Sequence, residues 1–163
     1  MKITIANLKH SESLSEETNA YTATILIDGK RAFDASNCGR GGMDLYHPIK
    51  DYTGPSESEI DAWLKANTPP IEFHGMTLEN SLELVVGDLI EEKLQTTRLK
   101  RMLKTKILVI ADDNGEPALY TYKGKPTPET LGAMKAAILS GKVSGRLVNG
   151  GDDALMEEAR KLV

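Results

Sequence analysis

Polar and apolar residues alternate along the first part of the chain, and this period of two predicts β-strands. The segments 2–8, 21–27 and 30–36 all have this pattern or are rich in residues that favour strands. Asp28-Gly29 lies between the second and third segments, and this dipeptide favours the positive φ angles of a type I′ turn. The pattern therefore predicts a β-hairpin that pairs with the first strand in an antiparallel meander.

The period changes to a helical one in the middle of the chain. Residues 56–67 predict a short helix, with Ser56 and Glu59 at capping-box spacing. Residues 71–76 fit a short strand or an extended segment. Residues 77–104 predict a long helix with Thr77 as its N-cap, because apolar residues recur at helical spacing on one face. That face consists of Leu78, Leu82, Val85, Val86, Leu89, Ile90 and Leu94.

The last third of the chain predicts a second hairpin followed by helices. Two strand patterns, 106–111 and 117–123, flank Asn114-Gly115, which again suits a type I′ turn. We expect helices over 127–140 and 152–162 to cover a sheet, and a short strand within 143–149. In the first helix, Thr127 predicts an N-cap without a full capping box.

Together these elements predict an α+β fold: an N-terminal antiparallel β-meander, a helical middle, and a second β-hairpin with covering helices. We treat residues 1–163 as a single domain. Its sub-lobes would be β-rich over 1–55, helical over 56–104, and a hairpin with helices over 105–163. The pattern leaves open whether the two hairpins share one sheet or belong to two lobes.

Composition narrows the class of protein. The chain has 163 residues, of which 40% are hydrophobic, so it can bury a core. Its net charge of -4 gives no general attraction to nucleic acid or to an anionic membrane. One cysteine excludes an intramolecular disulfide and any multi-cysteine zinc site. No signal-peptide pattern follows Met1 and no long apolar run spans a membrane, so we expect a cytoplasmic protein.

The most unusual stretch is residues 36–42, Ser-Asn-Cys-Gly-Arg-Gly-Gly, which we call the glycine loop. Its glycines suit a bulge or a wide turn at the end of a strand. Alternatively, its backbone N–H groups and Arg40 can hold a phosphate or carboxylate, although the Lys-Ser/Thr ending of a P-loop is absent. A third interpretation is a protein-contact loop. The candidate ligand- or partner-binding residues are Asn37, Gly39, Arg40, Gly41, Gly42, Tyr46 and His47.

Candidate catalytic groups are few. Cys38 is a nucleophile only if His47 or Arg40 lowers its pKa, and no acidic residue is fixed by spacing to orient the histidine. The three histidines, including His10 and His74, lie in separate polar segments without metal-ligand spacing. We therefore predict a non-catalytic protein without a cofactor or a metal, and keep a cysteine-dependent enzyme as an alternative.

Charges on the long predicted helix are sorted, with acidic residues first and basic residues last. This order complements the helix dipole, which is a sufficient structural explanation. A second interpretation is a partner-binding basic patch for an acidic protein or for nucleic acid. Aromatic residues for base stacking are missing there, so any nucleic-acid binding would depend on the local charge alone. The patch consists of Arg98, Lys100, Arg101 and Lys104.

The N-terminal pattern resembles a loosely defined group of small proteins encoded by bacteriophages and prophages. In that group the loop reads Ser-Asn-Asp-Gly-His-Gly-Gly and is followed by a tyrosine. Ser36, Asn37 and the three glycines of the glycine loop fit, whereas Cys38 and Arg40 replace the Asp and the His. Any chemistry of that replaced pair is therefore not carried over. The resemblance covers the chain to about residue 50, with a fainter similarity in the basic segment before Ile107.

The resemblance implies a phage context. Small phage accessory proteins often counter host defences by binding host complexes, and anti-CRISPR proteins are the best-known class. We therefore expect a non-catalytic accessory protein that binds a host protein or ribonucleoprotein complex, without membrane contact. Capture of a nucleotide or another anion by the glycine loop is the main alternative.

Overall fold

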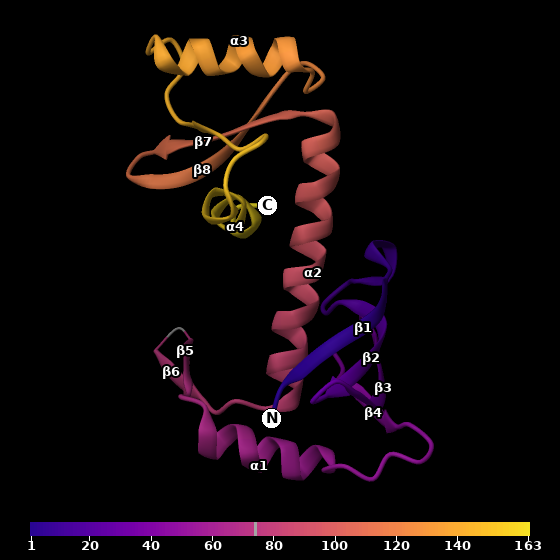
Figure 1. Ribbon diagram of the computed structural model, residues 1–163. Helices are drawn as coiled ribbons and strands as arrows, with labels where there is room; N and C mark the ends of the chain where they lie inside the picture. Colours follow the sequence, from indigo (N-terminus) through magenta and orange to yellow (C-terminus); the bar gives the residue numbers. More distant parts are fainter. Residues whose placement is uncertain (74) are drawn as a thin grey trace. The chain divides into compact units, whose positions relative to one another are not determined.

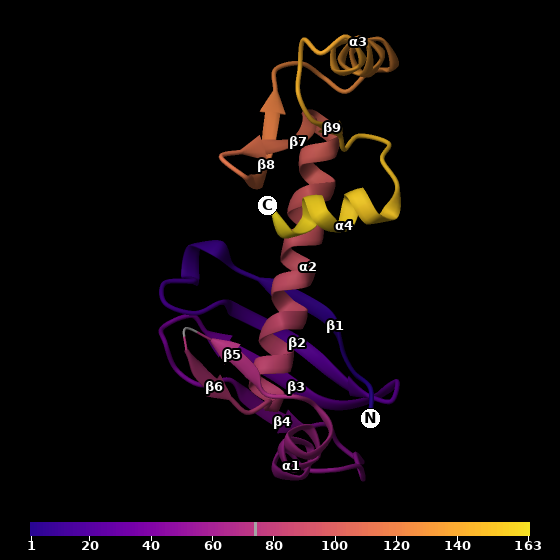
Figure 2. The ribbon, with the colours of Figure 1, turned by 90° about the vertical axis from the view of Figure 1, so that its left-hand side faces the viewer.

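The computed structural model describes residues 1–73 and 75–163, which form two compact units, residues 1–91 and 92–163 (Figures 1 and 2). Each unit contains strands and helices, so the predicted α+β class is confirmed. The two predicted hairpins lie in separate sheets. Helix α2 (Leu82–Thr105) includes the boundary between the units. The interpretation of His74 lies outside the described residues.

The first unit is built on the predicted antiparallel meander, with the strand order β1-β2-β3-β4. Asp28 and Gly29 have φ angles of 49° and 80°, as a type I′ turn between β2 and β3 requires. A fourth strand, which the pattern did not predict, pairs with residues 33–36 of β3. The bounds are β1 Ile3–His10, β2 Ala20–Ile27, β3 Lys30–Cys38 and β4 Leu45–Pro48, and a 3₁₀ turn at Glu12–Leu14 follows β1.

The core of this unit lies on one face of the meander. Cross-strand pairing places Ile5 beside Ile25 and Ile25 beside Phe33, and all three side chains are buried. Helix α1 (Glu57–Asn67) adds Ile60, and the first turns of α2 add apolar residues at the predicted helical spacing. The buried residues of these helices are Ile60, Leu64, Leu82, Val86 and Ile90.

The predicted N-terminus is correct for the first helix and wrong for the second. Helix α1 has the predicted capping box between Ser56 and Glu59. Helix α2 begins at Leu82, not at Thr77, because Met76–Leu78 forms strand β6 and pairs with β5 (Ile71–Phe73). The helix is capped where that hairpin ends: the Leu84 N–H donates to Ser81 Oγ, and the Leu82 N–H donates to Asp61 Oδ1 at 2.6 Å.

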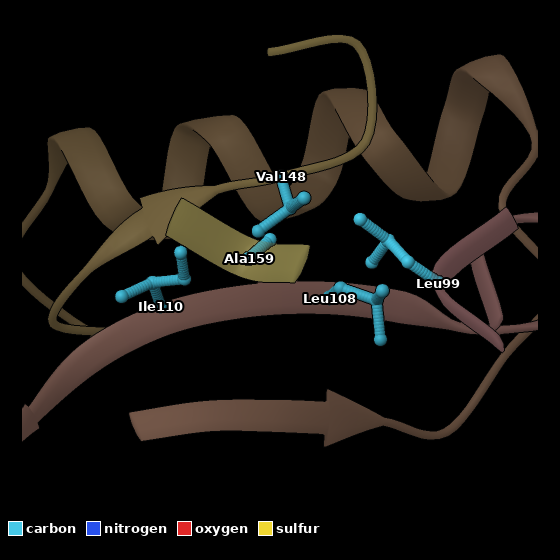
Figure 3. Close-up of a cluster of buried hydrophobic side chains, with 5 residues drawn as sticks. All are labelled: Leu99, Leu108, Ile110, Val148 and Ala159. Carbon is cyan, nitrogen blue, oxygen red and sulfur yellow. The ribbon is translucent and has the colours of Figure 1, made fainter. Parts of the chain in front are cut away.

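The second unit contains a three-stranded sheet with the order β8-β7-β9. Figure 3 shows side chains from α2, α4 and the segment after β9 lying against strand β7. The inward face predicted for the last helix is confirmed, since Leu155, Met156, Ala159 and Leu162 belong to this cluster or pack against it. The bounds are β7 Ile107–Asp113, β8 Glu116–Tyr122, α3 Pro128–Leu139, β9 Arg146–Leu147 and α4 Asp153–Lys161.

Helix α3 differs from its prediction. It contains no fully buried residue: Leu131, Met134 and Ile138 are half-buried, and Leu139 is 89% exposed, so the helix is less covered than predicted. The buried cluster of this unit takes its helical side chains from α2 and α4 instead. The N-terminus of α3 is better capped than expected, because the side chains and backbones of Thr127 and Thr130 form a complete reciprocal box.

None of the helices in the described part of the chain combines the length and the apolarity needed to cross a membrane.

Candidate functional site

The glycine loop joins β3 to β4 at the edge of the meander. Strand β3 continues through Cys38, so Ser36 and Asn37 are strand residues and the chain reverses after them. The reversal is held against the segment that precedes β2. The carbonyl oxygen of Gly39 accepts the N–H groups of Glu16 at 2.9 Å and Glu17 at 3.0 Å.

Gly39 is a position where only glycine fits. Its φ is +86°, and a Cβ added there would lie 2.1 Å from the carbonyl oxygen of Leu14 and 2.9 Å from the Cβ of Ala20. Gly41 also has a positive φ, +76°, but its nearest neighbour would be the carboxylate end of Glu17, a flexible side chain. The sequence pattern indicated the backbone freedom, and the structure adds the close packing at Gly39.

Asn37 ties the loop together with both ends of its amide. Its Nδ2 donates to the carbonyl oxygen of Gly42 at 2.8 Å and to Asp44 Oδ1 at 2.9 Å. Its Oδ1 accepts the Gly39 N–H at 2.8 Å and the Thr18 hydroxyl at 3.0 Å. With two donated and two accepted hydrogen bonds, this side chain fixes the width of the loop.

Asp44 anchors the far end of the loop. Its Oδ2 accepts the hydroxyl of Tyr21, which reaches it from β2, and the hydroxyl of Tyr46 at 2.9 Å. Its backbone N–H donates to Glu83 Oε1 at 3.4 Å. We call Tyr21, Asn37, Asp44 and Tyr46 the Asp44 network. Asp44 and Tyr21 were not predicted as members, because their contact spans 23 positions and has no local signature in the sequence.

The network favours neutral tyrosines. Burial raises the pKa of Tyr21, and the hydrogen bond to Asp44 raises it further. Burial and the negative charge of Asp44 raise the pKa of Tyr46 in the same way. The ring of Tyr46 also meets the ring of Phe33 edge-on, with centroids 6.5 Å apart. The site is thus suited to fixing the conformation of the loop, since its polar groups hydrogen-bond to one another.

The outer side of the loop presents a mixed surface. Arg40 is exposed, Met43 is 81% exposed, and Leu45 at the start of β4 is 57% exposed. His47 is also exposed and lies opposite Asp34 on β3. Exposed methionine and arginine on a fixed backbone are common at the centres of protein interfaces.

Two backbone N–H groups of the glycine loop already have hydrogen-bond acceptors within the protein. The Gly39 N–H is used by Asn37, and the Gly41 N–H lies 3.4 Å from the hydroxyl of Thr18. An anion at this loop would therefore depend on Arg40 and not on a row of glycine amides. Anion capture by this loop stays a prediction.

The structure does not bring Cys38 and His47 together. His47 pairs with Asp34, whereas Cys38 pairs with Ala20 and lies four residues farther along β3. That separation along the strand is about 13 Å, well beyond hydrogen-bond reach. Cys38 is exposed and lines a hollow of about 320 Å³ with His10.

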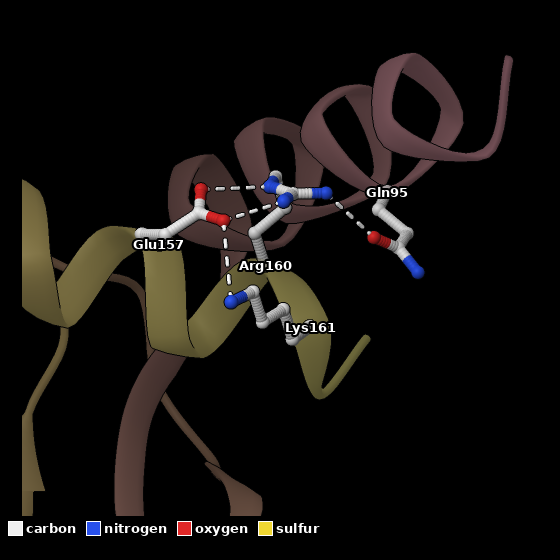
Figure 4. A network of polar contacts seen from close by, with 4 residues as sticks. All are labelled: Gln95, Glu157, Arg160 and Lys161. Atoms are coloured by element: carbon white, nitrogen blue, oxygen red, sulfur yellow. Dashed lines mark hydrogen bonds and ion pairs between the residues drawn. The ribbon is translucent and has the colours of Figure 1, made fainter. Parts of the chain in front are cut away.

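The predicted basic patch lies on the part of α2 that belongs to the second unit. All four of its residues, Arg98, Lys100, Arg101 and Lys104, are exposed. Arg160 differs from them, because it holds two elements together: it binds both carboxylate oxygens of Glu157 on α4 and Gln95 on α2 at 2.8 Å (Figure 4). Among the ion pairs of the described residues, none includes a member of the patch.

Within the described residues, no three His, Cys, Asp or Glu side chains are grouped so that they can hold a metal ion.

Comparison with known proteins finds no family model that matches the chain, and no curated protein or solved structure with significant similarity.

Proposed function

We propose that this protein is a non-catalytic accessory protein that binds a macromolecular complex through the glycine loop and Met43, the residue that follows it. The observation that supports this function best is a loop fixed by the Asp44 network that still exposes Met43 to solvent. A fixed loop loses little conformational entropy on binding, so its exposed apolar side chain contributes efficiently to affinity.

The partner class follows from the surface and from the resemblance to phage proteins. The partner is a host protein or a ribonucleoprotein complex in the host cytoplasm, of the kind that defence inhibitors such as anti-CRISPR proteins bind. Arg40 and Met43, which are both exposed, suit a partner surface with an apolar pocket and an acidic rim. The exposed residues of the basic patch favour the same acidic class of partner.

Helix α3 offers a second contact surface. Leu139 on this helix is 89% exposed, and the neighbouring Leu131, Met134 and Ile138 are only half-buried. A hydrophobic groove on a partner protein can bind such a helix.

The test is a pull-down from nuclease-treated bacterial lysate with the tagged full chain and two matched variants. Met43→Asp places a charge at the centre of the proposed contact surface. Met76→Asp is the control, since Met76 is an exposed methionine of the same unit, on β6. A Leu139→Asp variant tests α3 separately.

We expect the wild type and Met76→Asp to recover the same partner in stoichiometric amount, and Met43→Asp to recover less than about a tenth of it. Recovery of no stoichiometric partner by the wild type would overturn the proposed function. Equal recovery by Met43→Asp and Met76→Asp would remove the glycine loop as the contact surface. A parallel pull-down uses untreated lysate, and a partner recovered only from the untreated lysate would indicate nucleic acid as the true target.

A further inference from the structure

A pocket of about 530 Å³ lies at the other end of β3, beside the turn between β2 and β3. Its walls come from that turn and from the segment 49–55, which follows β4. The volume is within the range of about 300–1,000 Å³ that small-molecule sites occupy. Because β3 separates them, this pocket and the glycine loop are at opposite ends of the strand.

The rim of the pocket carries three cations, Lys30, Arg31 and Lys50. Among the ion pairs recorded for the described part of the chain, none includes any of them. Two carboxylates, Asp28 and Asp51, also line the pocket. The Asp28 carboxylate accepts the backbone N–H of Lys2 at 2.7 Å, and the three cations outnumber the two carboxylates by one positive charge.

The floor of the pocket is apolar and fixed. Ile27 and Ile49 line it together with Tyr52. The ring of Tyr52 meets that of Phe33 edge-on, with centroids 5.3 Å apart, and its hydroxyl donates to the carbonyl oxygen of Pro55 at 3.2 Å. A cationic rim above an apolar floor suits a ligand that combines an anionic group with an organic ring.

We propose that this pocket binds a free nucleotide, with its phosphates held by Lys30, Arg31 and Lys50. The base and the sugar lie over the floor that Ile27, Ile49 and Tyr52 form. The arginine offers bidentate hydrogen bonds to phosphate, and the lysines act as point charges. A small anion is favoured over a nucleic-acid chain, because the whole protein has a net charge of -4 and repels a long polyanion.

The experiment is isothermal titration of the full chain with ATP, adenosine, inorganic triphosphate and a short single-stranded oligonucleotide. The variants are Arg31→Ala and Lys50→Ala, with Arg40→Ala as the matched control. Arg40 is an exposed arginine of the same unit, but it belongs to the glycine loop. Circular dichroism checks that each variant is folded, and Lys50→Gln replaces any alanine variant that is not.

We expect saturable ATP binding that is weakened at least about tenfold by Arg31→Ala and by Lys50→Ala, and less than twofold by Arg40→Ala. Adenosine and triphosphate should each bind more weakly than ATP. The proposal is overturned if ATP does not bind, if adenosine binds as tightly as ATP, or if the oligonucleotide binds more tightly than ATP. Weakening by Arg40→Ala alone would move the anion site to the glycine loop and also overturn it. None of these outcomes depends on whether the glycine loop binds a partner.

Discussion

The two units use hydrogen-bonded polar side chains for different purposes. In the second unit, buried Asn149 accepts the Leu108 N–H at 2.7 Å and donates to the carbonyl oxygen of Lys106 at 3.0 Å. Its partners are backbone groups at the start of β7, so it fastens the sheet. In the first unit, Asp44 binds two tyrosines and Asn37, and its partners hold a surface loop.

This difference indicates where function lies. Buried polar groups must be fully paired to be tolerated, and a fully paired network specifies one conformation. In the second unit that conformation is a regular sheet with an apolar cluster, which any stable scaffold needs. In the first unit it is an irregular loop, which stability alone does not require. We therefore propose that the main contact surface belongs to the first unit.

The largest expected effect tests the second unit as an apolar scaffold. Leu108→Ala removes a fully buried side chain from the cluster in Figure 3 and should destabilise the protein by about 3–5 kcal/mol. Urea unfolding followed by circular dichroism measures the loss. Leu139→Ala, at an exposed leucine of the same unit, should change stability by less than about 0.5 kcal/mol. Equal effects would show that the cluster is not the core.

A pair of glycines tests the loop in the first unit. Gly39→Ala should destabilise by about 2–4 kcal/mol, because it combines a positive φ with a clash against the Leu14 backbone. Gly29→Ala has a positive φ but open space around it, and should cost about 1 kcal/mol. Fluorescence of Trp63, the single tryptophan, reports unfolding of this unit. A cost at Gly39 no greater than that at Gly29 would contradict the close packing.

Asp44→Ala tests the polar network itself. It leaves the hydroxyl of buried Tyr21 without its acceptor and removes one of the two acceptors of the Asn37 amide, so we expect a loss of about 2–3 kcal/mol. The control is Asp34→Ala, an exposed aspartate on β3 of the same sheet, which should change stability little. Similar unfolding midpoints for the two variants in urea would show that the network contributes nothing.

High pH should weaken the first unit selectively. The raised pKa values of Tyr21 and Tyr46 mean that folding favours their neutral forms over the unfolded state, where the pKa is about 10. That contribution is complete below about pH 10 and is lost as the pH rises further. Tyrosine absorbance should show two of the five tyrosines ionising only as Trp63 fluorescence reports unfolding. Ionisation of all five near pH 10 in the folded protein would contradict this.

The smallest effect concerns the ion-pair network in Figure 4. Arg160→Ala removes the bonds to Glu157 and Gln95, but these groups are partly solvated. We expect the thermal midpoint to fall by no more than about 4 °C, and the fall to shrink in high salt. A larger, salt-independent fall would mean that this network, and not the apolar cluster, holds α4 in place.

Local signals were enough to predict most of the fold. The turns at Asp28-Gly29 and Asn114-Gly115 and the cap at Ser56 depend on neighbouring residues alone, and the structure confirms them. Strand β4 and the start of α2 at Leu82 were missed because they depend on pairing with other segments. The exposure of Leu139 on α3 was missed because helical periodicity does not show how far each apolar position is covered.

The site was predictable only in part, for the same reason. The glycines and Asn37 lie within a few residues of one another and indicate an unusual backbone conformation. Tyr21 and Glu83 reach Asp44 from positions 23 and 39 residues away, so no spacing pattern points to them. The pairing of Cys38 with His47 was open at the sequence level, and only the register of β3 separates the two side chains.

The central claim is that the glycine loop is fixed before it meets a partner, and hydrogen exchange tests it directly. The Gly39 N–H bonds to Asn37, and the Glu16 N–H bonds to the Gly39 carbonyl oxygen. By NMR, we predict that both amides exchange at least about 100-fold more slowly than in an unstructured peptide, and that Asp44→Ala removes most of this protection. Exchange of either amide at the unstructured rate in the wild-type protein would contradict the account.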